Sequence, residues 1–350
     1  MQSVNLEKLR KLLPPLYRAG LPVFLWGPSG AAKSTSVHLF VEEMRKTDPS
    51  FGFIDLRASM MDPVDVRGVP FVNKDADGKG TDASWVPFDC FPNAQRDGER
   101  GVLNIEELNG APPPVQLSLY QLTFDRRIGD YTLPDGWVVW AGGNRDSDNG
   151  VTYQVPSPLA NRFAQHILVE PTVEDFVSYG IKNGIRMDVL GFIRFRPDLL
   201  FTYDHDNPSL TFGTLRSYTY LSQLVDEFEK EGLDEDEFLY PVIQNCIGEG
   251  TGIEYFSFRK YYQSLPDLKE LIRDPEGAEV PTENAVLYAV IMGLFQLADE
   301  KNAGRIIRYA TRLKTEFSVL LIRDCTKHVP GFAEVPEYVE WASKNHSIIC

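Results

Sequence analysis

The sequence predicts an α/β domain built on a mostly parallel sheet, followed by a helical region. In the first half of the chain, short apolar segments alternate with stretches of helical spacing, a pattern typical of parallel strands covered by helices on both faces. A glycine-bearing loop joins the first strong apolar segment to a helix. From about residue 171 onward the spacing is helical, with Pro, Gly or Asp between most segments.

The expected elements of the first half follow one another closely. Leucines at helical spacing predict a helix over residues 6–19, which we expect Pro14-Pro15 to interrupt because proline lacks the backbone N–H. The remaining expectations are strands at 22–26, 51–56, 102–105 and 137–141, a helix at 34–45, and an exposed loop or insertion at 73–98.

The second half reads as a series of helices. Helical spacing predicts them at 172–183, 186–196, 214–230, 234–247, 283–297 and within 303–326, before a Pro-rich tail at 330–336. The sequence thus divides into three expected domains: an α/β nucleotide-binding core at 1–170, a helical lid at 171–270 and a C-terminal helical extension at 271–350.

Composition narrows the class of partner. The 350 residues include 35 basic and 50 acidic side chains, a formal charge of −15, which argues against nucleic acid or an anionic membrane as the main partner. No apolar run reaches the ~18 residues that a membrane span needs. The four cysteines lie far apart, as reduced thiols do in the cytosol. We therefore expect a soluble cytoplasmic protein without a membrane span.

The glycine-bearing loop matches a phosphate-binding motif. Residues 27–34 fit the pattern G-x-x-x-x-G-K-[ST], except that Ala32 stands at the second glycine. We expect Ala32 to take helical dihedrals rather than left-handed ones. In such loops the backbone N–H groups and the helix N-terminus face phosphate, the lysine lies between the β- and γ-phosphates, and the Ser hydroxyl can ligate Mg²⁺. The candidate nucleotide-binding residues are Gly27, Pro28, Ser29, Gly30, Ala31, Ala32, Lys33, Ser34 and Thr35.

A second motif places two acids at the end of an apolar strand. Residues 102–109 read Val-Leu-Asn-Ile-Glu-Glu-Leu-Asn, which suits a Walker B segment. There Glu106 would support the Mg²⁺ shell, and Glu107 would orient and deprotonate the attacking water. Most such sites have Asp at the first position. Because Glu106 is longer by one methylene, we expect that hydrolysis could be slow.

Two further residues are candidates by position. Asn144 ends the expected strand at 137–141, at the edge where ligands bind in open α/β sheets, so it could bind the attacking water or the γ-phosphate, or cap a turn. Arg162 precedes Phe163 and could form an ordinary salt bridge or act as an arginine finger on a neighbouring subunit. The local sequence does not separate these alternatives.

In combination, these motifs resemble those of the AAA+ ATPase superfamily over nearly the whole chain. The finer resemblance is to the MoxR branch, whose members accompany von Willebrand factor A proteins, and it rests on the loop with Ala for Gly, on residues 62–70 and on the segment 124–134 before sensor 1. At the lid, Leu215 replaces the proline usual before a sensor 2 arginine. The implied fold is an AAA+ P-loop αβα sandwich followed by a helical lid and a helical C-terminal region.

The resemblance implies ATP and Mg²⁺ as cofactors and a homo-oligomeric ring, expected to be a hexamer. It also implies a protein client that the ring remodels, activates or loads, together with a von Willebrand factor A partner on another polypeptide. Arg126 or Arg127 could replace Arg162 as the trans-acting finger. The implied roles are phosphate and metal binding for Lys33 and Ser34, metal support for Glu106, catalytic base for Glu107, sensor 1 for Asn144, arginine finger for Arg162 and sensor 2 for Arg216.

Two other functions remain open. The Glu106 and Leu215 departures would suit a nucleotide-dependent scaffold that binds ATP with little hydrolysis. Related rings act on DNA, so a DNA-acting AAA+ motor is the third hypothesis, and the net charge of −15 counts against it.

Overall fold

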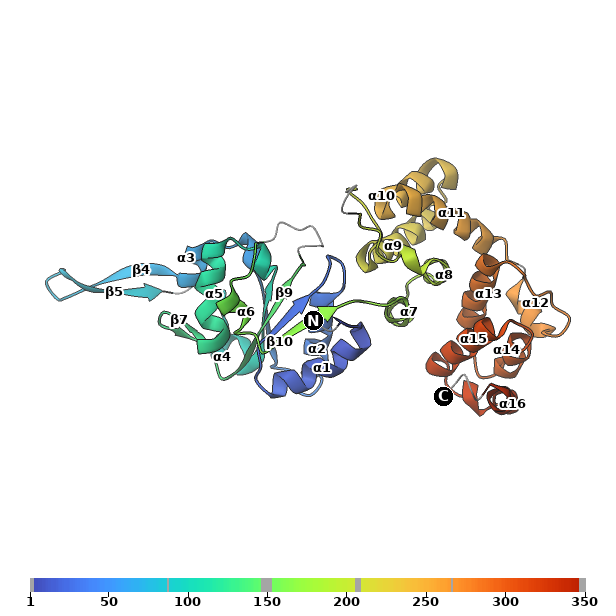
Figure 1. The fold of residues 1–350 in the computed structure, drawn as a ribbon, viewed down its shortest axis with the longest axis horizontal. Helices are drawn as coiled ribbons and strands as arrows, with labels where there is room; N and C mark the ends of the chain where they lie inside the picture. The colour runs from blue at the N-terminus through green and yellow to red at the C-terminus, as the bar shows by residue number, and fades with distance from the viewer. Residues whose placement is uncertain (1–2, 87, 146–152, 205–208, 266, 346–350) are drawn as a thin grey trace. The chain divides into compact units, whose positions relative to one another are not determined.

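The chain divides into two compact units, Met1–Asp175 and Phe176–Cys350. The computed structural model describes residues 3–86, 88–145, 153–204, 209–265 and 267–345 (Figure 1). The first unit holds the strands and the second is helical. The boundary after Asp175 lies five residues beyond the end of the core expected at 1–170.

Unit 1 is a three-layer αβα sandwich around a parallel sheet. Its six strands lie in the order β1-β10-β2-β9-β6-β3, and every neighbouring pair is parallel. The central strands are almost entirely buried. Their bounds are β1 Ser3–Val4, β2 Val23–Trp26, β3 Gly52–Arg57, β6 Arg100–Glu106, β9 Gly136–Gly143 and β10 Gln165–Val169. The four strands expected from apolar segments are thus β2, β3, β6 and β9.

Alternation along each strand supplies two separate cores. In β2, Val23 and Leu25 pack with α1 (Leu6–Arg18) and α2 (Lys33–Arg45) on one face of the sheet. Phe24 and Trp26 face the other side, where α3 (Pro63–Arg67), α5 (Pro113–Asp125) and α6 (Ser157–Ala160) supply the apolar partners. Covering both faces explains why these strands read as continuous apolar runs.

Helix α1 corrects one expectation. It runs unbroken from Leu6 to Arg18 with Pro14 and Pro15 inside it. The two prolines cannot donate to the carbonyls of Arg10 and Lys11, but both of these residues are exposed, so water can satisfy their carbonyls. Buried Leu9 and Leu13 hold the opposite face of the helix against the sheet.

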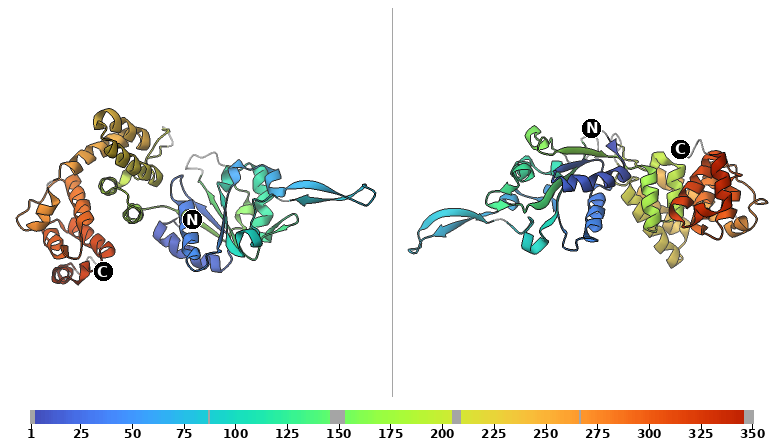
Figure 2. Two further views of the ribbon diagram at one scale, coloured as in Figure 1. Left: turned by 180° about the vertical axis from the view of Figure 1, so that it is seen from behind. Right: turned by 90° about the horizontal axis from the view of Figure 1, so that it is seen from below.

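Two hairpins depart from the sheet. The insertion expected at 73–98 is largely an antiparallel hairpin of β4 (Val69–Lys74) and β5 (Gly80–Val86), followed by the short α4 (Ala94–Asp97). Figure 2 shows this hairpin extending away from the body of unit 1 in both views. The second hairpin, β7 (Arg127–Ile128) with β8 (Tyr131–Thr132), lies within the segment 124–134 and leads into β9.

Unit 2 is helical and centres on α13 (Asn284–Leu297), which is largely buried and packs on α8, α11 and α15. The structure draws no boundary at 270, because this residue lies inside α12 and both sides belong to one unit. The region 303–326 holds two helices. The other bounds are α7 Val173–Lys182, α8 Met187–Phe195, α9 Leu215–Glu231, a π-helix Glu235–Leu239, α10 Tyr240–Ile247, α11 Glu249–Gln263, α12 Leu268–Arg273, α14 Ala303–Ala310, α15 Thr315–His328 and α16 Pro336–Lys344.

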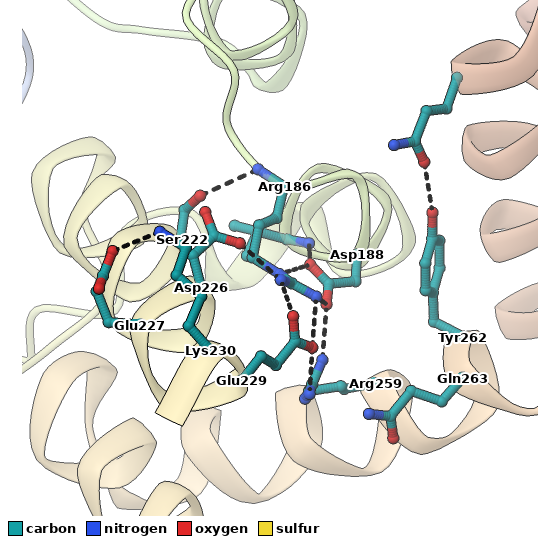
Figure 3. Close-up of polar contacts among 12 residues, drawn as sticks. Arg186, Asp188, Ser222, Asp226, Glu227, Glu229, Lys230, Arg259, Tyr262 and Gln263 are labelled. Carbon is teal, nitrogen blue, oxygen red and sulfur yellow. Dashed lines mark hydrogen bonds and ion pairs between the residues drawn. The ribbon is translucent and has the colours of Figure 1, made fainter. Parts of the chain in front are cut away.

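Charged side chains cross-link the helices of unit 2 (Figure 3). We call the set Arg186, Asp188, Asp226, Glu229, Glu235 and Arg259 the Arg186 network. Asp188, which is fully buried, lies 2.9 Å from Arg186 and 3.1 Å from Arg259. Glu229 joins the same two arginines at 2.7 Å each. The network ties α8, α9 and α11 together.

Among the described residues, no helix is long and apolar enough to cross a membrane.

Candidate nucleotide-binding site

The phosphate loop lies between β2 and α2 and packs against the ends of the neighbouring strands β9 and β10. The Gly27 backbone N–H donates to the Gly143 carbonyl at 3.3 Å, and Ala31 donates to Pro28 at 3.2 Å. A Cβ on Gly27 would lie only 2.7 Å from the Val169 carbonyl oxygen. Since that oxygen belongs to backbone and cannot move aside cheaply, position 27 requires glycine.

Ala32 corrects a second expectation. Its φ of 60° and ψ of 28° are left-handed, not helical. The glycine of the common pattern would take this conformation without steric cost, whereas an L-residue with a Cβ loses about 1–2 kcal/mol. Strained backbone of this kind clusters at ligand sites, where surrounding structure enforces it.

Lys33 begins α2 and is 9% exposed. Its ammonium donates to the carbonyls of Gly27 at 2.6 Å and Pro28 at 3.0 Å, and to Asn144 Oδ1 at 3.1 Å. No side chain caps the N-terminus of α2, so the amides of its first turn face outward at the positive end of the helix dipole. Ser34 is half-buried and Thr35 exposed in the same turn. This arrangement suits a bound phosphate.

Glu106 is the last residue of β6 and is held in place by a neighbour on its own strand. Asn104 donates to Glu106 Oε1 at 2.6 Å and lies 3.2 Å from Asp55 Oδ1 on β3. A Cβ on Gly142 of β9 would lie 3.0 Å from Glu106 Oε2, so glycine there makes room for the carboxylate. No role was predicted for Asn104 from the sequence, although a polar residue inside an apolar strand indicates a buried hydrogen bond.

Glu107 follows with a left-handed backbone, φ 54°, ahead of the short 3-10 helix Leu108–Gly110. The Ser59 hydroxyl donates to Glu107 Oε2 at 2.5 Å. Ser59 lies in the 3-10 helix Ala58–Met60 that follows β3. Nothing in the sequence around Ser59 pointed to this contact, because the two residues are 48 positions apart.

Asn144 follows β9 and is fixed by Asn109. Asn109 Nδ2 donates to the Asn144 carbonyl at 2.6 Å, and the Asn144 N–H donates to Asn109 Oδ1 at 3.2 Å. Gly143 admits Asn109, because a Cβ there would lie 2.5 Å from its Oδ1. The strands β2, β9 and β6 are adjacent in the sheet and parallel, so their carboxyl ends bring Lys33, Asn144, Glu106 and Glu107 to one edge.

The oxygen donors at this edge fit Mg²⁺. The Ser34 hydroxyl and the Glu106 carboxylate are hard ligands of the kind Mg²⁺ prefers. Within the part of the chain that the structure describes, no three His, Cys, Asp or Glu side chains are grouped to hold a metal on their own. Mg²⁺ commonly binds through one or two carboxylates, with substrate phosphates and water as further ligands, so a protein cage is not needed.

The candidate arginine fingers of unit 1 lie near the amino ends of the strands, opposite the carboxyl ends that carry the phosphate loop. Arg162 precedes β10, whose first residue pairs with Val23 at the start of β2, whereas the phosphate loop follows Trp26 at its end. Four strand residues at about 3.3 Å each separate the two ends by about 13 Å. The Arg162 guanidinium lies 3.6 Å from the Tyr120 ring centroid and 3.4 Å from Asp125.

Arg126 and Arg127 lie at this same edge, Arg126 just before the β7–β8 hairpin and Arg127 as the first residue of β7. Arg126 donates to the carbonyls of Pro134 at 2.7 Å and Asp135 at 3.2 Å, while Arg127 is exposed.

Arg216 belongs to unit 2, where it is the exposed second residue of α9. The buried Leu215 and a Thr214–Ser217 capping box set the start of that helix.

Comparison with known proteins assigns no family to this chain. No protein-family model matches the sequence, and no curated protein matches it. Among solved structures, NtrX from Brucella abortus in complex with ADP aligns with 100% of this chain and 70% of its own, at 13% identity and a TM-score of 0.41. A RuvB variant from Thermotoga maritima aligns over 82% of this chain and 80% of its own, at 16% identity and a TM-score of 0.38. TM-scores this low do not establish a shared fold. The chain's own geometry makes unit 1 an α/β sandwich with a phosphate loop, followed by a helical region.

Proposed function

We propose that this chain is an AAA+ ATPase of the MoxR type that binds and hydrolyses ATP with Mg²⁺. One observation carries the proposal. Three adjacent parallel strands deliver Lys33, Asn144 and the Glu106-Glu107 pair to one edge, where the Lys33 ammonium lies 3.1 Å from Asn144 Oδ1. A phosphate-binding cation, a metal-supporting acid, a general base and an amide that can orient water are the groups that phosphoryl transfer to water requires.

Each residue has a distinct part in this proposal. The loop amides and Lys33 bind the β- and γ-phosphates, and Asn144 orients the attacking water. Glu107 accepts the proton of that water through the carboxylate oxygen that Ser59 does not hold. Mg²⁺ bound at Ser34 and Glu106 would supply charge neutralisation for the phosphates.

We further propose that the site is completed by a second copy of the chain in a ring, with the hexamer as the expected form. The supporting observation is the placement of Arg162, Arg126 and Arg127 at the edge opposite the phosphate loop of the same subunit. Arg162 is the first choice, with Arg216 as a further contributor from unit 2. The ring would remodel, activate or load a protein client, with a separate von Willebrand factor A protein as partner.

The test measures ATP binding and ADP production by the purified full-length chain. The wild type should bind ATP and release ADP over many turnovers with Mg²⁺. Lys33→Ala should lose binding, because it removes the cation from the loop, whereas Lys11→Ala, at an exposed residue of α1, should change neither quantity. Equal ATP binding by wild type and Lys33→Ala would contradict the proposal.

A scaffold that binds ATP with little hydrolysis is the second candidate. The hydrogen bond from Ser59 favours it, because at 2.5 Å it occupies one of the two oxygens of the Glu107 carboxylate and holds the side chain in one orientation. Ser59→Ala distinguishes the two. A several-fold rise in turnover would indicate an ATPase restrained by Ser59, and bound ATP with no turnover in either protein would support the scaffold.

A further inference from the structure

Arg162 lies in the turn formed by residues 159–163, and contacts on two sides hold this turn in place. Its own backbone closes through Arg162 N to Leu159 O and Phe163 N to Ala160 O, both at 3.1 Å. On one side, the Arg162 guanidinium stacks on Tyr120 of α5 and pairs with Asp125. On the other side, the Ala160 carbonyl also bonds to His166 Nε2 at 2.8 Å. The position of the guanidinium therefore depends on contacts that lie outside the turn.

His166 connects this turn to the central strand β2. Trp26 Nε1 donates to His166 Nδ1 at 3.0 Å. An indole nitrogen only donates, so Nδ1 must carry the lone pair, and the ring proton lies on Nε2 and points to Ala160 O. Both nitrogens of a neutral imidazole are therefore used. Trp26 is the residue immediately before Gly27 of the phosphate loop.

Aromatic packing reinforces the same connection. Phe24, fully buried, stacks on Trp26 with ring centroids 4.1 Å apart, and it meets Phe163 edge-on at 5.1 Å. Phe163, next to Arg162, is 4% exposed. The sheet thus holds one end of the turn through Phe163 and the other through His166 and Ala160.

We propose that His166 is a positioning residue for Arg162: by bridging Trp26 and Ala160, it fixes the turn so that the guanidinium reaches the γ-phosphate bound by a neighbouring subunit. The inference rests on the proposed function, since it requires Arg162 to act in trans. Without the bridge, the turn keeps the packing of Phe163, its contacts with α5 and the hydrogen bond from Ala164 N to Pro22 O, but the Ala160 carbonyl loses its bond to His166. A displacement of about 1 Å in a catalytic group costs up to ~10²-fold in rate.

The test separates the subunit that supplies the arginine from the subunit that supplies the site. Glu107→Gln makes a subunit that cannot hydrolyse ATP but retains Arg162, and Arg162→Ala makes one with an intact site but no finger. Mixing the two should restore turnover at interfaces that combine the intact site with the intact finger. His166→Phe, which keeps a ring but loses both hydrogen bonds, is then added to one parent at a time.

We expect His166→Phe in the Glu107→Gln parent to lower the restored turnover at least about tenfold, and in the Arg162→Ala parent to cost far less. His166→Gln in the Glu107→Gln parent should recover much of the rate, because an amide can accept from Trp26 and donate to Ala160. His38→Phe, at an exposed histidine of α2, is the matched control.

Equal losses in both parents, or a loss confined to the parent that supplies the site, would overturn the role of His166 while leaving the trans site intact. The two parents failing to complement each other without any His166 change would contradict the trans site itself. A thermal scan of each variant identifies any that fails to fold, and His166→Gln then decides the question.

Discussion

The nucleotide-binding edge of unit 1 and the Arg186 network of unit 2 both gather charged side chains, but they hold them differently. At the nucleotide edge, the Asn104 amide holds Glu106 and the Ser59 hydroxyl holds Glu107. In the Arg186 network, each charge is paired with an opposite charge at 2.7–3.1 Å. The described partners of the two carboxylates are neutral donors, which orient Glu106 and Glu107 without neutralising them, whereas the network neutralises its charges internally.

Backbone strain follows the same division. Among the described residues, the non-glycine positions with positive φ are Ala32, Glu107 and Arg126, all in unit 1. Two of them lie at the nucleotide edge. The members of the Arg186 network lie on helices or next to them. The contrast indicates that strained backbone in unit 1 lowers its stability and shapes the candidate site. The Arg186 network, in contrast, holds the helices of unit 2 together.

The largest expected effect is on catalysis in unit 1. Glu107→Gln removes the proposed base but keeps the size of the side chain and its contact with Ser59. General-base catalysis contributes ~10²–10⁴-fold, so turnover should fall by about 10³-fold while ATP binding stays within about twofold. Steady-state ADP release and equilibrium binding of ATP check this. Turnover equal to that of the wild type would remove Glu107 from the proposed mechanism.

The next effect is on the stability of unit 2. Asp188→Ala removes the fully buried carboxylate that pairs with the half-buried Arg186 and the buried Arg259, and breaking a buried pair in this way costs about 3–5 kcal/mol. Asp226→Ala removes a partner of Arg186 whose side chain is 42% exposed, and should cost less than about 1 kcal/mol. Hydrogen exchange of unit 2 peptides measures both, and similar losses would mean that burial of the network is unimportant.

Acid should weaken the same network. Burial alone would raise the pKa of Glu229, but hydrogen bonds from Arg186 and Arg259 outweigh it and hold the pKa below its ordinary value. A carboxyl with a lowered folded-state pKa adds stability above its unfolded-state pKa, and this stability is lost as pH falls through the folded-state pKa. Unit 2 should therefore lose stability below about pH 4, and less so in Glu229→Gln. Denaturant titrations at several pH values test this, and an equal acid response in both proteins would contradict it.

The smallest effect expected is at Ala32. Ala32→Gly relieves about 1–2 kcal/mol of left-handed strain, but glycine also makes the unfolded chain more flexible by roughly 0.5–1 kcal/mol. The net expectation is a gain of about 0.5 kcal/mol in the stability of unit 1, checked by denaturant unfolding. Thr35→Gly, in the first turn of α2 where φ is helical, should destabilise instead. A loss at position 32 would mean that the loop does not carry this strain.

The sequence predicted the parts of the fold that depend on local pattern. Apolar runs located β2, β3, β6 and β9, and helical spacing located most of the helices. It failed at Ala32, because alanine itself disfavours the left-handed conformation that the residue takes in the folded loop. It also failed at Pro14-Pro15, where packing of Leu9 and Leu13 outweighs two missing hydrogen bonds.

The sequence indicated which motif residues would gather at one edge of the sheet, but not the residues that hold them in place; their roles in a site stay a prediction. Lys33, Glu106, Glu107 and Asn144 stand in recognisable motifs and meet at one edge as expected. Ser59, Asn104 and Asn109 position them through contacts that only the folded sheet creates. The sequence did not predict the Arg186 network for the same reason, since Asp188 and Arg259 are 71 residues apart.

The central claim is a site for ATP that a second subunit completes. The most direct measurement is the rate of Mg-ATP hydrolysis per subunit as a function of protein concentration, with the oligomeric state followed by sizing on the same samples. The account predicts a specific rate that rises with concentration as rings form and then levels off. A nonzero rate that stays constant down to concentrations at which sizing shows only monomer would contradict it.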